Sequence, residues 1–147
     1  TAAAGASRRL AAMSAPRFLL DTNICIYIIN RRPPAVFEHF AGSRIGEVAI
    51  SSITGAELGF GVARSGSARN RDALDKFLAS LEILPFDESA MRAYGPLRAA
   101  LERAGTPIGA LDLLIAAHAL ALECTLVSNN LREFSRIQGL KLANWAA

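Results

Sequence analysis

Short apolar runs alternate with longer segments of mixed character from Arg17 to the end of the chain. The runs at 17–21, 47–50, 82–86 and 125–127 predict buried strands, and 140–143 predicts a final edge strand. The longer segments between them carry helical spacing and helix-capping residues such as Ser51 or Ser52 and Asp87. These predicted helices span 22–30, 35–43, about 52–64, 70–80, 88–104, 110–122 and 131–134.

Strands that alternate with helices predict an α/β fold, with a parallel sheet of four to five strands flanked by helices on both faces. We expect a single domain over residues 17–147, preceded by a flexible leader over 1–16. Ligands of such sheets bind at the carboxyl ends of the strands. Polar residues follow two of these ends, Asp21 after the first strand and 128–130 after the fourth. No glycine-rich loop follows the first strand, which argues against a dinucleotide or P-loop site.

Three acids stand out by their surroundings. Asp112 lies in a helix that is apolar on almost every side, where an unpaired carboxylate is costly. Asp21 ends a strand, and Glu57 lies in a mostly apolar helix. Each has an ordinary structural explanation, because Asp21 can cap a helix, Glu57 can face solvent and Asp112 can interact with a helix dipole. Together, three acids from distant segments near one sheet edge favour a metal site.

Composition narrows the class of protein. At 147 residues with 52% hydrophobic and 20% charged residues, the chain suits one globular domain, and no apolar run is long enough to span a membrane. The net charge is only +3, but 14 of the 16 basic residues are arginine, which weakly suggests nucleic acid as a ligand. Cys25 and Cys124 are too few for a thiolate metal site, so we expect buried, reduced thiols in a cytoplasmic protein.

Several of these segments, in this order and spacing, resemble a known family. The chain is similar to PIN domains, specifically to the VapC-type toxin ribonucleases of bacterial toxin–antitoxin pairs. The resemblance covers essentially everything from Arg17 onward. The segments that carry it are Phe18-Leu-Leu-Asp-Thr-Asn23, Ala49-Ile-Ser-Ser-Ile-Thr-Gly-Ala-Glu-Leu58, Pro107-Ile-Gly-Ala-Leu-Asp-Leu-Leu-Ile-Ala-Ala-His118, Leu126-Val-Ser-Asn-Asn130 with Glu133-Phe134, and Gly139-Leu-Lys-Leu-Ala-Asn-Trp145.

This resemblance implies roles for individual residues. Asp21, Glu57 and Asp112 fall on the acidic positions that hold Mg²⁺ or Mn²⁺ in the family, and such hard cations prefer oxygen ligands. The fourth catalytic position, often Asp in the family, is Asn130 here. An amide brings no charge, so we expect a site one charge short of the fullest family pattern. That difference weakens the case for a second, permanently bound metal.

Further candidates lie around these positions. Residues beside the expected ligands are predicted to orient water or carboxylates, and four arginines are candidate RNA contacts that solvated helix ends explain equally well. His118 is expected to be a core residue and His39 an ordinary surface residue. The expected orienting residues are Thr22, Asn23 and Ser128, and the arginines are Arg31, Arg32, Arg64 and Arg69.

The leading hypothesis is a metal-dependent endoribonuclease toxin that cleaves RNA, with tRNA as the expected substrate. The resemblance also implies a small VapB-like antitoxin as partner, whose tail occupies the active-site groove and often supplies an arginine, and a homodimer. One alternative is a catalytically weak module that binds RNA or a partner. Another is a phosphatase that uses Asp21 as nucleophile, although such enzymes usually carry a second Asp where this chain has Asn23.

Overall fold

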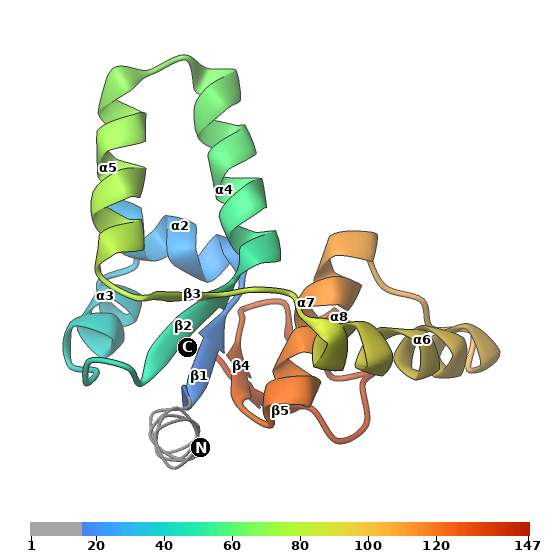
Figure 1. Cartoon of the computed structure of the whole chain (residues 1–147). Coiled ribbons are helices and arrows are strands. Elements are labelled where there is room, and N and C mark those ends of the chain that lie inside the picture. Colours follow the sequence, from blue (N-terminus) through green and yellow to red (C-terminus); the bar gives the residue numbers. More distant parts are fainter. Residues whose placement is uncertain (1–15) are drawn as a thin grey trace, which may run out of the picture.

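The computed structural model describes residues 16–147, in which strands and helices alternate as the sequence predicts (Figure 1). The expected leader therefore lies outside the described residues, apart from Pro16. In chain order the elements are β1 (Phe18–Leu20), α2 (Thr22–Asn30), α3 (Pro34–Ala41), β2 (Val48–Ser51), α4 (Ser52–Ser65), α5 (Ala68–Ala79), β3 (Glu82–Leu84), α6 (Glu88–Arg103), α7 (Ala110–Leu122), β4 (Thr125–Val127), α8 (Leu131–Phe134) and β5 (Lys141–Ala143).

The five strands form one parallel sheet in the order β3-β2-β1-β4-β5. This confirms the predicted fold class and places the last strand at an edge, next to β4. The third strand is shorter than expected and ends at Leu84. Pro85 follows it and has no N–H for the ladder, while the Phe86 N–H donates to the Ser52 hydroxyl instead, at 3.0 Å.

The sheet separates two hydrophobic cores. Neighbouring residues of a strand point to opposite faces, so Leu20 packs with α2, α3, α4 and α5, whereas Leu19 packs with α6, α7 and α8. In Figure 1, α4 and α5 form a helical hairpin that rises away from the sheet, and α6 lies beside α7 and extends away from this hairpin. Gly66 allows the turn between α4 and α5, because its φ of +64° is a conformation that other residues rarely adopt.

Predicted capping residues begin three of the helices. Asp21, Ser51 and Asp87 each accept a hydrogen bond from a backbone N–H in the first turn of α2, α4 and α6, respectively. Because Asp21 and Ser51 also stand at the carboxyl ends of β1 and β2, the strand-to-helix junctions fix both side chains at one edge of the sheet.

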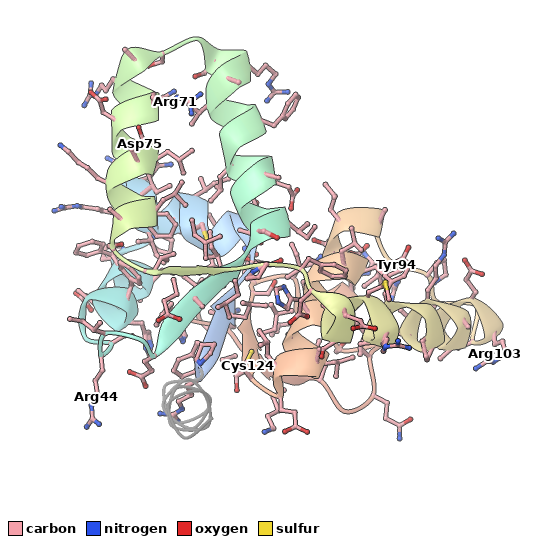
Figure 2. All side chains as sticks on the ribbon, in the orientation of Figure 1. Arg44, Arg71, Asp75, Tyr94, Arg103 and Cys124 are labelled. Atoms are coloured by element: carbon pink, nitrogen blue, oxygen red, sulfur yellow. The ribbon has the colours of Figure 1, made fainter. Side chains whose placement is uncertain are left out.

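Both cysteines are buried and free, as expected. Cys25 belongs to the core beneath α2, and Cys124 precedes β4 in the opposite core (Figure 2). Over residues 16–147, none of the helices has the length and apolar character needed to cross a membrane.

Candidate active site

The candidate site begins where β1 and β4 end, side by side in the sheet. Asp21 is only 4% exposed, and one of its carboxylate oxygens accepts the N–H of Ile24 at 2.9 Å. Burial raises the pKa of Asp21, hydrogen bonds from Ser128 and Ile24 lower it, and the charge of Glu57 raises it further. The capping explanation of Asp21 is therefore correct, but it does not exclude a second role, because the same carboxylate lies close to another acid.

Glu57 reaches this edge from the second turn of α4. Its side chain is half-buried, and its Oε1 accepts a hydrogen bond of 2.7 Å from the Thr22 hydroxyl. Thr22 is the first residue of α2, directly after Asp21. This contact joins segments 35 residues apart and holds Glu57 toward Asp21. The structure thus places the Thr22 hydroxyl on the Glu57 carboxylate.

Asp112 stands in the first turn of α7, half-buried, beside an acid that the sequence did not single out as a site residue. The pKa of Asp112 is raised to about 6, first by burial, next by the neighbouring Glu133, and then by the charges of Asp21 and Glu57. Four carboxylates from four segments therefore influence one another. Among the described residues, none of the four forms an ion pair with Lys, Arg or His.

Glu133 is a fourth acid near Asp21, Glu57 and Asp112. It lies on α8, three residues after Asn130, and the Asn130 side-chain amide donates to its Oε2 at 3.1 Å. The structure therefore places Asn130 beside Glu133 and near the other predicted residues. The available signal was the spacing Asn-x-x-Glu, which places both side chains on the same side of a helical turn.

Ser128 holds the loop after β4 to this site. Its buried hydroxyl hydrogen-bonds the Asp21 carboxylate and accepts the backbone N–H of Asn130 at 2.9 Å. Asn129, between them, donates to the Tyr27 hydroxyl of α2 at 2.7 Å. Asn23 differs from the other predicted orienting residues, because it is exposed and its side chain makes no hydrogen bond with another described residue.

A groove of about 680 Å³ leads away from Glu57 between α2, α4 and α5. Thr22 and Glu57 lie at one part of its lining, Arg69 and Asn70 at another, and the other lining residues are mostly apolar. Of the four predicted RNA-contacting arginines, the structure places only Arg69 in this groove. Two others lie over aromatic rings and the fourth is exposed; they are Arg31 over Phe37, Arg64 over Phe60, and Arg32.

The donor set suits a hard divalent cation held largely through water. Within residues 16–147, no three acids, histidines or cysteines are grouped closely enough to enclose a metal ion. Mg²⁺ is ordinarily bound by one or two carboxylates and several waters, so it does not require such a cage. The repulsion that raises the pKa of Asp112 is what a bound cation would relieve.

The two histidines lie as predicted. His118 is 1% exposed, and its Nδ1 lies 2.8 Å from the Ser51 hydroxyl in the core. His39 is exposed on α3 and stacks on Trp145, with ring centroids 5.2 Å apart.

Comparisons with known proteins agree with this architecture. The PIN domain family matches residues 18–140. The chain is 46% identical to ribonuclease VapC2 of Rickettsia felis over 130 residues, covering 87% of this chain and 97% of the relative. It is 39% identical to the tRNA(fMet)-specific endonuclease VapC of Shigella flexneri over 131 residues, covering 88% of this chain and 98% of the relative.

Solved structures give the same result. VapBC2 of Rickettsia felis, bound to a DNA fragment from its promoter, superposes with a TM-score of 0.77 at 46% identity over 87% of this chain and 98% of that one. DNA-bound VapBC of Salmonella typhimurium superposes with a TM-score of 0.82 at 40% identity over 88% of this chain and 98% of that one. The chain therefore belongs to the PIN-domain family, and within it to the VapC group of toxin–antitoxin ribonucleases.

Proposed function

We propose that this protein is a metal-dependent endoribonuclease that acts as the toxin of a toxin–antitoxin pair and inhibits translation by cleaving tRNA. The observation that carries the proposal is the cluster of Asp21, Glu57, Asp112 and Glu133 at the carboxyl edge of the sheet, with no described cationic side chain to neutralise it. Such a cluster has a folding cost, which a bound cation would offset.

In the proposed reaction each residue has a physical task. Asp21 and Asp112, together with Glu57 and Glu133, would hold Mg²⁺ or Mn²⁺ directly or through water, and such a cation would supply positive charge to stabilise the developing charge on the RNA phosphate. Thr22 and Ser128 fix the carboxylates of Glu57 and Asp21 through their hydrogen bonds. In the cation-free protein, burial and the neighbouring carboxylates raise the pKa of Asp112 to about 6, so a proton on Asp112 would have to leave before a cation binds.

The antitoxin is proposed to occupy the groove between α2, α4 and α5. The two VapBC structures that superpose on this chain are complexes, which supports a VapB-like partner. The groove is apolar over much of its lining, suited to an apolar peptide segment, and it opens beside the carboxylate cluster. A cationic side chain at the end of that segment, such as arginine, would neutralise the cluster and exclude a metal ion. The homodimer and the cytoplasmic location remain predictions.

The names of the relatives favour cleavage over the alternative of a binding module. The direct test incubates the purified chain with initiator tRNA and bulk tRNA, in Mg²⁺, Mn²⁺ or EDTA. Asp21→Asn and Asp112→Asn should abolish cutting, whereas Asp75→Asn on the exposed face of α5 should not (Figure 2). Binding without cutting would support the module, and hydrolysis of small phosphate esters but not RNA would support the phosphatase.

A further inference from the structure

The helix that carries Asp112 has almost no directional contact with the rest of the protein. Along α7, Asp112 and His118 are the only polar side chains, and the helix packs through residues such as Leu113, Ile115 and Ala116. Apolar packing is not directional, so it allows a helix to rotate or slide by small amounts. A hydrogen bond, in contrast, is lost when its distance or angle changes.

Among the described residues, His118 is the only residue of α7 whose side chain forms a hydrogen bond with the start of α4. Its Nδ1 lies 2.8 Å from the Ser51 hydroxyl, and the same hydroxyl accepts the N–H of Ile53 at 3.1 Å. The ring of Phe86 contacts His118 edge to face, with centroids 5.5 Å apart, and the Phe86 N–H is bonded to Ser52. The imidazole is therefore enclosed by the β2–α4 junction and the segment after β3.

Each partner of the contact between His118 and Ser51 lies six residues from a carboxylate of the candidate site. Asp112 precedes His118 by six residues on α7, and Glu57 follows Ser51 by six residues on α4. Six residues correspond to about 9 Å along a helix. They also correspond to about one and two-thirds turns, so Asp112 and His118 leave α7 on different sides. A rotation of α7 that breaks the His118 contact would therefore carry Asp112 away from its neighbours.

We propose that His118 is a positioning residue, whose hydrogen bond to Ser51 sets where α7 presents Asp112 relative to Glu57 and Glu133. The inference rests on the proposed function, because it concerns the carboxylates that would hold the metal. His118 touches neither the substrate nor the cation in this proposal. It acts only through the orientation of α7.

The test compares three variants with the wild-type protein. His118→Leu removes the hydrogen bond, His118→Asn keeps a polar atom near the place of Nδ1, and Leu101→Ala weakens the same core from α6 without touching the contact. Mn²⁺ affinity, measured by electron paramagnetic resonance of the free ion, should fall about tenfold in His118→Leu. The kcat for RNA cleavage should fall with it, while KM stays unchanged. His118→Asn should recover most of both losses.

A second readout needs neither metal nor activity. The crystal structure of metal-free His118→Leu should show α7 rotated and the Asp112 side chain displaced relative to Glu57 and Glu133, whereas His118→Asn and Leu101→Ala should keep Asp112 in place. The proposal is overturned if Asp112 keeps its position in His118→Leu, or if Leu101→Ala loses as much Mn²⁺ affinity as His118→Leu. If the wild-type protein neither binds Mn²⁺ nor cuts RNA, the proposed function fails, while the crystal structures still decide whether His118 orients α7.

Discussion

Asp112 of α7 and Glu133 of α8 are acids from different helices that lie close enough for the charge of Glu133 to raise the pKa of Asp112. A half-buried carboxylate that faces other carboxylates binds a proton more readily than one in water. Burial and the neighbouring charges of Glu133, Asp21 and Glu57 make that proton favourable and bring the pKa of Asp112 to about 6. Asp112 is therefore sensitive both to pH and to any cation that competes with the proton.

Asp112→Asn is expected to abolish RNA cleavage and to stabilise the fold near neutral pH. Asp112 binds a proton more tightly in the folded protein than in the unfolded chain. Its contribution to the free energy of unfolding is therefore complete below about pH 4 and is lost as the pH rises to about 6. Because the side chain is only half-buried, solvent screening limits the gain at pH 7 to about 1 to 2 kcal/mol. Urea unfolding at pH 4, 5, 6 and 7 measures it.

The matched control is Asp75→Asn, which removes an exposed acid of α5 (Figure 2). Its unfolding free energy should differ little from that of the wild-type protein at each pH. If Asp112→Asn were less stable than wild type at pH 7, Asp112 would have a structural role that outweighs its burial cost.

Stabilisation by Mg²⁺ or Mn²⁺ should increase with pH. The cation and the proton compete for the same carboxylates, so binding is weak while Asp112 is protonated. We expect the rise in Tm at a fixed Mn²⁺ concentration to be small at pH 5 and to grow through pH 6 to pH 7.5. A rise in Tm that is independent of pH, or one that is equal in Asp112→Asn, would place the cation elsewhere.

Thr22→Val should reduce metal affinity and cleavage by about 10- to 100-fold, with little change in stability. The substitution keeps the shape of the side chain but removes the hydroxyl that donates to Glu57 at 2.7 Å. Thr22→Ser keeps the hydroxyl and should retain most of the activity. Initial cleavage rates over a range of Mn²⁺ concentrations distinguish weaker metal binding from slower chemistry. Equal activity of the Val and Ser variants would contradict the orienting role.

Arg69→Ala should weaken RNA binding, because Arg69 is the predicted RNA-contacting arginine that lines the groove. One phosphate contact fewer should reduce the slope of log affinity against log salt concentration by about 1. Arg103→Ala, at the far end of α6, changes the net charge equally and should leave the slope unchanged (Figure 2). Binding is best measured with Asp112→Asn as background, so that the RNA stays intact.

The sequence predicted most of the fold because local chemistry determines it. Strand apolarity, the capping side chains and the alternation of elements each depend on nearby residues, and α2 and α8 have the bounds that the sequence suggested. The differences lie where a single residue changes the outcome. The strand β3 is shortened by Pro85, and α3 begins one residue earlier than expected, at Pro34, whose ring suits a first helical position.

The site was predictable only in part. Asp21, Glu57 and Asp112 stood out as acids in apolar surroundings, which is a local property. Glu133 did not, since α8 has only four residues and an acid there resembles any surface residue. Its contact with Asp112 depends on how α7 and α8 pack in one core, which local sequence does not contain. The position of Arg69 in the groove depends in the same way on the pairing of α4 with α5.

The sheet divides the molecule into two cores, and this division bears on how such a protein can change over evolution. The groove lies on α2, α4 and α5, whose buried residues belong mostly to one core, whereas α7 packs in the other. Substitutions at well-separated sites usually add independently. We therefore expect the groove proposed to bind the antitoxin to vary among related proteins while the core around Asp112 stays intact, so that binding specificity diverges faster than chemistry.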